Sequence, residues 1–189
     1  MKKVLILIGS PRKKGSTAVL AAEAERGARE LGIETETVFL NDLNMKGCQA
    51  CYWCKKNDVA ECAVKDEMQK VHRLMQESDG IIVASPIYFA GVTAQTKAWL
   101  DRLFPYIGIN LTPKMPAGKR VSFIITQNQP DTRLFETPVA TFMHMVGLTG
   151  LSVRDSMLAC DLDAGIKPLV TEKRDLMERA YGIGRDLLA

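Results

Sequence analysis

The stretch KVLILIGSPRKKGST, residues 3–17, decides the fold class of this 189-residue chain. Its first part, residues 3–10, is a short continuous apolar run that ends at glycine and proline, as in a strand buried on both faces. Strands of that kind belong to parallel sheets with helices packed on each side. The stretch therefore predicts a parallel α/β sheet whose first strand lies next to the N-terminus.

Apolar runs and helical patterns alternate along the rest of the chain. Strands are predicted over 3–10, 34–40, 80–86, 120–127 and 151–158, and helices over 16–31, 66–78, 92–104, 137–147 and 171–188. Five strands alternating with helices favour the flavodoxin-like arrangement over the Rossmann-like one. We therefore predict a single α/β domain over 1–189, a flavodoxin-like three-layer sandwich with a five-stranded parallel sheet of order 2-1-3-4-5. A cysteine-rich insertion is expected at about 41–65.

Composition narrows the class of protein. The net charge of +3 is small and the basic residues are scattered apart from 12–14, which argues against a nucleic-acid binder. The start of the chain imitates a signal peptide, but its apolar run is too short and SPRKKGS follows where a cleavage site belongs. No segment approaches the apolar length that spans a bilayer. We therefore expect a cytoplasmic protein, in which clustered cysteines are more often metal ligands or catalytic groups than disulfides.

Residues 9–17 join the first strand to the first helix and have the composition of an anion-binding turn. Two glycines let the backbone turn closely, Ser16 and Thr17 are expected to cap the helix, and three basic side chains follow Pro11. The free amides of a helix N-terminus favour an anion. The loop matches neither GxxxxGK[ST], because no lysine follows Gly15, nor GxGxxG. The predicted ligand is therefore a single terminal phosphate.

Four of the five cysteines lie within residues 48–62, in the spacing C-x2-C-x2-C-x7-C. The loop that carries them leaves the second strand at the same sheet edge as the phosphate loop, so we expect the thiols on the side of the phosphate site. This spacing suits an all-thiolate [4Fe–4S] cluster better than zinc, which usually pairs two well-separated C-x-x-C units. A redox disulfide such as Cys51–Cys54 and a metal-free loop are the other interpretations.

A second loop, SPIYFAGVTAQTKAWLDR over 85–102, follows the third strand and places two aromatic side chains at the rim, where they can lie against a planar ring. Together with GSPRKKGST it resembles the flavodoxin-like NADPH-dependent FMN reductase family. The cysteine run followed by VKDEM, residues 64–68, is similar to the iron–sulfur flavoproteins within that family. The resemblance covers residues 1–130, and the last third of the chain carries only a fold-level likeness.

The resemblance implies one FMN-binding domain with a cluster site in its cysteine insertion. The FMN phosphate would be held by Ser10, Arg12, Ser16 and Thr17, the isoalloxazine would be lined by Pro86, Ile87, Tyr88 and Phe89, and its third side would be closed by Thr126, Gln127 and Asn128. The cluster ligands implied are Cys48, Cys51, Cys54 and Cys62. Two features depart from the family pattern: the loop at 126–131 has no glycine, and the gap of seven before the last cysteine is long.

The function implied by the resemblance is an FMN-dependent oxidoreductase that takes hydride from NAD(P)H and passes electrons on, through the [4Fe–4S] cluster where one is present. No side-chain acid or base is demanded, because the flavin carries the chemistry. The expected partners are NAD(P)H, an unknown electron acceptor and further copies of the chain in a homodimer or homotetramer, without nucleic acid or membrane. The alternatives are an FMN electron carrier, a flavin reductase without a metal cluster, and a zinc-stabilised interaction module.

Several chemistry-bearing residues lie outside these motifs. Cys160 stands alone after the fifth strand and is expected to be buried. His72 and His144 are isolated from any catalytic constellation and are expected to be structural or surface residues. Gly182 and Gly184 are expected to weaken the closing helix, because glycine is a poor helix former.

Overall fold

Five parallel strands form the main sheet of the computed structural model, which describes residues 1–162 and 169–189. The strands are β1 (Lys3–Ile8), β2 (Glu34–Phe39), β3 (Gly80–Tyr88), β5 (Arg120–Thr126) and β6 (Ser152–Ala159). Their order is β2-β1-β3-β5-β6, and each neighbouring pair runs parallel. The predicted order 2-1-3-4-5 is confirmed, because the additional strand β4 lies off this path.

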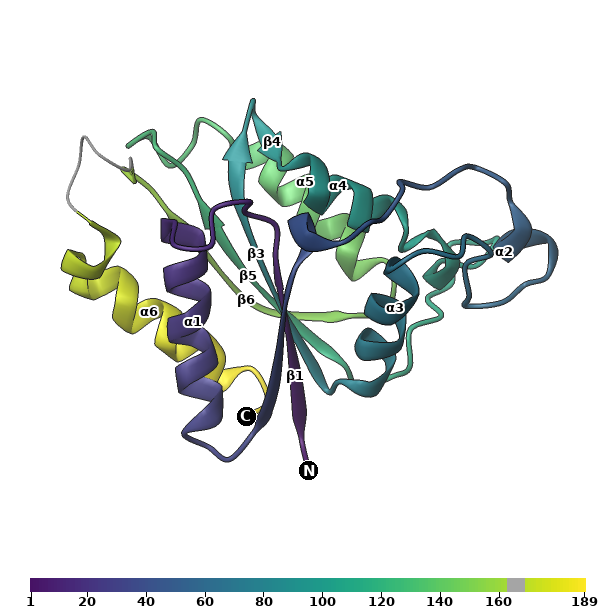
Figure 1. Ribbon diagram of the computed structural model, residues 1–189, viewed down its shortest axis with the longest axis horizontal. Helices are drawn as coiled ribbons and strands as arrows, with labels where there is room; N and C mark the ends of the chain where they lie inside the picture. Colours follow the sequence, from purple (N-terminus) through teal and green to yellow (C-terminus); the bar gives the residue numbers. More distant parts are fainter. Residues whose placement is uncertain (163–168) are drawn as a thin grey trace.

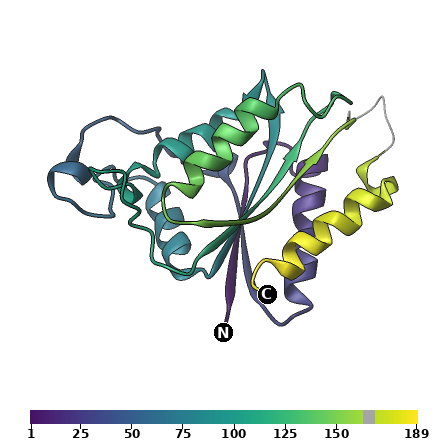
Figure 2. The same ribbon diagram turned by 180° about the vertical axis from the view of Figure 1, so that it is seen from behind.

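Helices cover both faces of the sheet, as Figures 1 and 2 show from opposite sides. On one face lie α1 (Ser16–Arg29) and α6 (Arg174–Asp186), and on the other lie α3 (Met68–Glu77), α4 (Ala94–Asp101) and α5 (Glu136–Gly147). The result is the predicted α/β flavodoxin-like three-layer sandwich. Within the described part of the chain, no helix combines the length and apolar character needed to cross a membrane.

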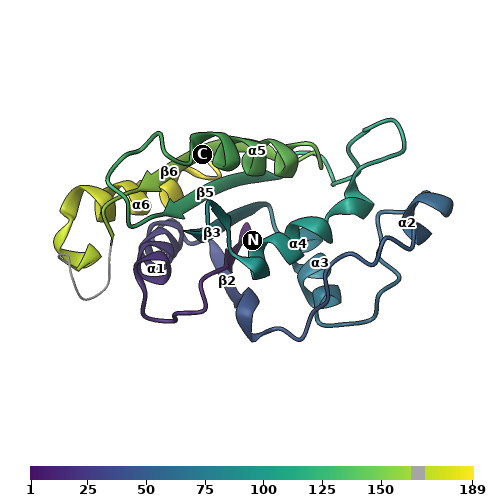
Figure 3. The same cartoon turned by 90° about the horizontal axis from the view of Figure 1, so that it is seen from above.

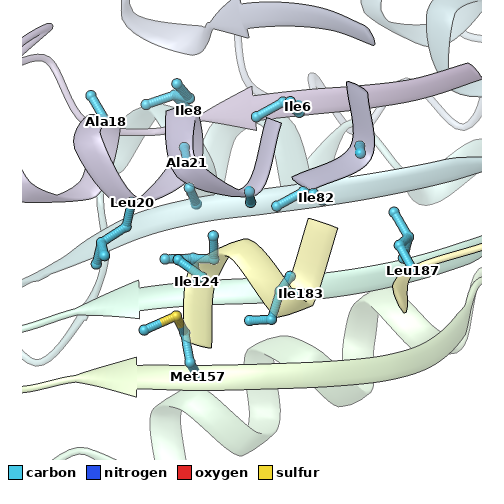
Figure 4. Packing of buried hydrophobic residues seen from close by; sticks show 14 of the residues in the cluster. Ile6, Ile8, Ala18, Leu20, Ala21, Ile82, Ile124, Met157, Ile183 and Leu187 are labelled. Carbon is cyan, nitrogen blue, oxygen red and sulfur yellow. The ribbon is translucent and has the colours of Figure 1, made fainter. Parts of the chain in front are cut away.

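The apolar run of β1 supplies both halves of the core. Successive side chains of a strand point to opposite faces, so Ile6 and Ile8 pack with α1 and α6, whereas Leu5 and Leu7 pack with α3 and α4. All four are at most 2% exposed. Figure 4 shows Ile6 and Ile8 beside Ile82 of β3 under α1. Burial on both faces is the reason why this strand is apolar throughout instead of alternating.

The contact between α1 and α6 depends on two glycines. A Cβ added at Gly184 would lie 1.7 Å from the carbonyl oxygen of Ala24, and one added at Gly27 would lie 2.2 Å from that of Tyr181. The helices therefore meet backbone against backbone. Gly184 permits this close approach, whereas a Cβ at Gly182 would meet no atom within 4 Å.

The segment after β3 differs from the prediction. The strand runs to Tyr88 and turns back into β4 (Gly91–Val92), so the expected loop is an antiparallel hairpin. Helix α4 begins at Ala94, two residues later than predicted. The later start follows from Thr93, which caps the helix by accepting a hydrogen bond from the Thr96 amide. Short helical turns that were not predicted are η1 (Leu40–Asp42), α2 (Trp53–Lys56) and η2 (Phe104–Tyr106). A further turn, η3 (Val170–Glu172), overlaps the start of the helix predicted over 171–188.

The hairpin tip is strained. Phe89 and Ala90 have φ of 47° and 68°, in the left-handed region that costs an ordinary residue about 1–2 kcal/mol. We expect Ala90→Gly to raise the free energy of unfolding by about 0.5–1 kcal/mol, measured by urea unfolding. The same change at Ala98, within α4, should lower it by about 1 kcal/mol. Equal destabilisation by both variants would show that the turn stores no strain.

Candidate functional site

A pocket opens where the carboxyl ends of β1, β3 and β5 meet, with a cavity of about 370 Å³. This size lies within the range of small-molecule sites. Its lining comprises Arg12, Ser16, Thr17, Pro86, Ile87, Tyr88, Phe89, Thr126, Gln127, Asn128 and Leu162. Ten of the eleven residues expected around FMN therefore share one cavity. The eleventh, Ser10, is buried behind it, where its hydroxyl accepts the Arg12 amide at 3.2 Å.

The helix N-terminus at this pocket is built for an anion. The first bond within α1 is donated by the Val19 amide to Gly15, and no side chain caps the preceding turns. No acidic residue occurs in the first turn. The expectation that Ser16 and Thr17 cap the helix is wrong, because the Thr17 hydroxyl bonds instead to Thr126 Oγ1 at 2.7 Å. The first amides of the helix are thus left to a ligand.

The hairpin forms a second wall. Pro86 ends the buried part of β3 and Ile87 is half-buried, whereas Tyr88 is 43% exposed and Phe89 stands fully in solvent at the tip. The tip has a left-handed backbone at Phe89 and Ala90. Strain at a ligand-facing turn is a feature of binding sites, and here it sets an exposed aromatic at the pocket mouth.

The third wall contains an unused hydrogen-bond acceptor. Gln127 is 3% exposed, and its Nε2 donates to Gln129 O at 3.0 Å and Asp131 O at 2.8 Å. Its Oε1 has no partner among the described residues. Buried amide oxygens in folded proteins are nearly always bonded, so this oxygen fits a ligand N–H in the pocket. The loop holds the amide through carbonyls of its own turn, and no glycine is needed.

The four clustered cysteines line one small cavity, which we call the thiol cavity, together with Arg102 and Phe104. Cys48 and Cys51 are exposed, Cys62 is half-buried, and Cys54 is buried. Burial raises the pKa of the Cys54 thiol, partly offset by the charge of Lys55. All five cysteines are free thiols, so the Cys51–Cys54 disulfide is not formed.

The segment 46–64 that carries these cysteines, the thiol loop, is tied to the body of the molecule. Lys55 donates to the carbonyls of Phe104 and Ile107, and its ammonium lies 3.8 Å from the centre of the Phe104 ring. Gln69 of α3 donates to Cys62 O at 2.8 Å and to Val64 O at 2.7 Å. The loop is therefore held by the Lys55 side chain and by its own backbone carbonyls, while its sulfurs line the thiol cavity.

The thiol cavity and the pocket are separate within one chain. They share no lining residue, and Figures 1 and 3 show α2 at the far end of the molecule from the start of α1. Only the beginning of the insertion stays near the phosphate loop, where Lys13 pairs with Asp42 at 2.7 Å. The loop after β2 leaves the same sheet edge as the phosphate loop, but it then turns away and docks on η2 and the end of α4, so the thiols do not line the pocket.

The donor set of the thiol cavity is all-sulfur. Among the described residues, no group of three or more His, Cys, Asp or Glu side chains is gathered closely enough to hold a metal ion. The thiol cavity itself has a volume of only about 20 Å³, so the match to an all-thiolate [4Fe–4S] cluster lies in the ligands and not in the space between them. Four thiols around one cavity fit such a cluster in residue type and number.

Most of the chain, residues 2–150, matches a family model described as NADPH-dependent FMN reductase. The chain belongs to the NADPH-dependent FMN reductase family. That family match begins before the phosphate loop and ends after α5, so it contains all three walls of the pocket and the whole thiol loop.

Similar curated proteins are iron–sulfur flavoproteins. One from Methanocaldococcus jannaschii is 41% identical over 60% of this chain and 58% of its own length. One from Archaeoglobus fulgidus is 36% identical over 55% of this chain and 46% of its own length. One from Methanosarcina thermophila is 32% identical over 77% of this chain and 75% of its own. The matched segments thus span about half of the first two relatives and three quarters of the third.

Solved structures share the fold. An NAD(P)H:quinone oxidoreductase from Methanothermobacter marburgensis has a TM-score of 0.76 and 18% identity, covering 100% of this chain and 98% of its own. An FMN-dependent NADH-azoreductase from Bacillus anthracis, solved in complex with FMN, has a TM-score of 0.74 and 12% identity, covering 100% of both chains. Identities this low confirm the flavodoxin-like architecture alone.

Three residues that hold the thiol loop in this FMN reductase family member were not predicted from the sequence. They are Asp66, Gln69 and Arg102. One signal in the sequence could have identified them. Arg102 lies three residues after Trp99 and one before Leu103, so it falls on the apolar face of its helix. A charge on a buried face needs a partner, and Asp66 in VKDEM is that partner.

A buried histidine lies under the thiol loop. His72 Nδ1 is 3.0 Å from the Tyr106 hydroxyl, and His72 Nε2 has no partner in the described part of the chain. Burial lowers the pKa of His72 to about 4 and raises that of Tyr106 to about 12. The imidazole is therefore neutral at pH 7. The expectation of structural or surface histidines is confirmed, since His72 is buried and His144 is exposed.

This histidine makes stability depend on pH. Its pKa is lowered from 6.5 to about 4 on folding, so the unfolded chain binds the extra proton first as the pH falls. Stability present above pH 6.5 should be lost progressively down to pH 4, by up to about 3 kcal/mol. His72→Gln should remove this slope from urea unfolding curves, and His144→Gln should retain it. A slope unchanged in His72→Gln would contradict the assignment.

Proposed function

We propose that this chain is an FMN-dependent oxidoreductase that takes hydride from NAD(P)H and passes electrons to a further acceptor. The observation that carries the proposal is the single cavity lined by ten residues of the three FMN loops, with an unpartnered buried acceptor on one wall. Membership of the NADPH-dependent FMN reductase family supports the same assignment.

Each wall has a distinct task in binding. The first amides of α1 and the Arg12 guanidinium hold the terminal phosphate, because both present positive charge to an anion. The strand end at Pro86 and Ile87 gives an apolar surface for a planar ring, and Gln127 Oε1 accepts a ring N–H. Bound FMN would supply the hydride and single-electron chemistry that side chains lack.

Access to the ring is set by the hairpin. Tyr88 and Phe89 stand at the mouth, where an entering nicotinamide must pass them. No described side chain is needed as a general acid or base, so the protein contributes binding, orientation and control of access.

We also propose that Cys48, Cys51, Cys54 and Cys62 hold a [4Fe–4S] cluster. The shared cavity supports this assignment, as do the iron–sulfur flavoproteins among the relatives. Such a cluster would supply one-electron transfer. Because the thiol cavity and the pocket are separate within one chain, a second copy would be needed to bring one beside the other, which favours the homodimer or homotetramer expected for the family.

Anaerobic reconstitution with FMN tests the flavin assignment and the use of NAD(P)H. With FMN added, the protein should retain one flavin after desalting and oxidise NAD(P)H in steady state. A protein that stays colourless refutes the flavin assignment, and one that binds FMN without oxidising NAD(P)H is an electron carrier.

Sedimentation analysis should give a mass of at least two chains, and a monomer would contradict the oligomer.

Cys54→Ser isolates the cluster assignment. We expect the variant to lose iron, sulfide and the broad visible absorption between the flavin bands, because the cluster loses a thiolate ligand. FMN binding should be retained. The control is Cys160→Ser, which changes a half-buried cysteine outside the thiol cavity and should keep both. Zinc in place of iron, or no metal in either variant, would overturn the assignment.

A further inference from the structure

Arg102, the C-cap residue directly after α4, carries a charged side chain with no exposed surface. Its guanidinium forms a two-pronged pair with Asp66, in which Nη1 donates to Oδ2 at 2.7 Å and Nη2 to Oδ1 at 3.0 Å. The same nitrogens donate to Lys46 O at 2.8 Å and Val64 O at 3.3 Å. Burying an arginine is costly even with such partners.

Asp66 completes a clamp on the thiol loop. Its Oδ2 accepts the Lys46 amide at 3.0 Å and its Oδ1 accepts the Met68 amide at 3.1 Å. Lys46 lies two residues before the first clustered cysteine, and Val64 lies two residues after the last. The ion pair therefore joins the two ends of the thiol loop to each other and to α4. A loop closed at its base in this way has less freedom for its sulfurs.

The arginine also faces the sulfurs. It lines the thiol cavity with all four clustered cysteines, and its Nε is a buried donor without a partner among the described residues. An arginine guanidinium stays charged in proteins, and its two bonds to Asp66 hold that charge in one place. The guanidinium thus keeps a fixed positive charge beside the thiol cavity, with one N–H unused.

We propose that Arg102 is the positioning residue of the thiol site: with Asp66 it closes the thiol loop, and its fixed charge and unused N–H stabilise negative charge on the sulfurs. The second half rests on the proposed function, since it concerns a loaded cluster. Added positive charge favours the reduced state of such a site, because reduction adds an electron. The first half applies to the metal-free protein as well.

The metal-free protein tests the clamp. Hydrogen exchange of amides in the thiol loop should be at least tenfold faster in Arg102→Lys, which keeps the charge but loses the fork, and in Asp66→Asn. Amides of β1 should be unchanged in both, which shows that the fold is intact. The control is Lys56→Met, an exposed charge in the same loop, which should exchange like the parent protein. Unchanged exchange in both clamp variants would overturn the proposal.

The loaded protein tests the charge through the reduction potential of the cluster. We expect Arg102→Met to shift the reduction equilibrium about tenfold toward the oxidised state, or about 59 mV for one electron. Asp66→Asn should shift it in the opposite direction, and Arg102→Lys should stay near the parent value. A merely structural role predicts shifts of one sign in all three, and that result would refute the charge effect.

Each variant remains decisive on its own terms. Where Arg102→Met does not fold, Asp66→Asn and Arg102→Lys still test the charge effect. Only a charge effect raises the reduction potential in Asp66→Asn and leaves it unchanged in Arg102→Lys. Where no cluster can be loaded, the cluster assignment fails by metal analysis. The exchange measurements then still support or overturn the clamp.

Discussion

Gly184→Ala is expected to destabilise the protein by about 3 kcal/mol, near the upper end of the costs seen for overpacked cores. The added methyl group would lie 1.7 Å from Ala24 O and 2.5 Å from Ala24 C, and these are backbone atoms of α1. Backbone in a helix cannot rotate out of the way as a side chain can, so α6 must move off α1. The melting temperature should fall by about 6–12 °C.

The matched control is Gly182, which lies two residues before Gly184 in the same helix. Gly182→Ala makes the same chemical change in the same helix, but its Cβ would meet no atom within 4 Å. Alanine is a better helix former than glycine, so this variant should gain about 1 kcal/mol. Urea unfolding of the two proteins therefore gives effects of opposite sign. Stabilisation by both changes would show that the helices do not meet backbone to backbone.

Ser16→Glu is expected to weaken FMN binding roughly 100-fold or more, because it places a carboxylate where the phosphate of the ligand would sit. Ser16 begins α1 and lines the pocket. A negative side chain in the first turn of a helix is itself favourable by about 0.3–1 kcal/mol. The melting temperature of the FMN-free protein should therefore stay unchanged or rise, so the loss of affinity is separate from folding. Quenching of free FMN fluorescence measures the dissociation constant.

Lys14→Gln provides the control for overall charge. It also lowers the net charge by one, but Lys14 is exposed and does not line the pocket. Its effect on the dissociation constant should be no more than about threefold, since exposed charges are screened by salt. Equal affinity for FMN in Ser16→Glu and the parent protein would show that the phosphate does not bind at the N-terminus of α1. The proposed orientation of the flavin would then be wrong as well.

The apolar pattern predicted the sheet because burial leaves a periodic trace in the sequence. Residues 3–10 read as a strand covered on both faces, and β1 is covered by helices on both faces. The three pocket walls could be placed for the same reason, since parallel strands bring their carboxyl ends to one edge. The residue roles within those walls came from the family resemblance.

Contacts between distant segments left no such trace. Nothing in the stretch 171–188 marks Gly184 as a contact and Gly182 as free space, because the distinction lies in α1, which is distant in sequence. The hairpin tip at Phe89 and Ala90 lacks the Asn-Gly or Gly-Gly pair that usually announces such a turn. The unused acceptor of Gln127 is likewise visible only once its neighbours surround it.

The sequence by itself determined the positions of the strands, the glycine-bearing loop at 9–17 and the presence of four grouped thiols, because each depends on residues that are neighbours along the chain. Only the tertiary structure decided where those thiols lie. The buried pair of Arg102 and Asp66, which are 36 residues apart, draws the thiol loop onto the end of α4 and away from the pocket. A charge buried at a distance must find its partner in space, and spacing along the chain does not encode that partner.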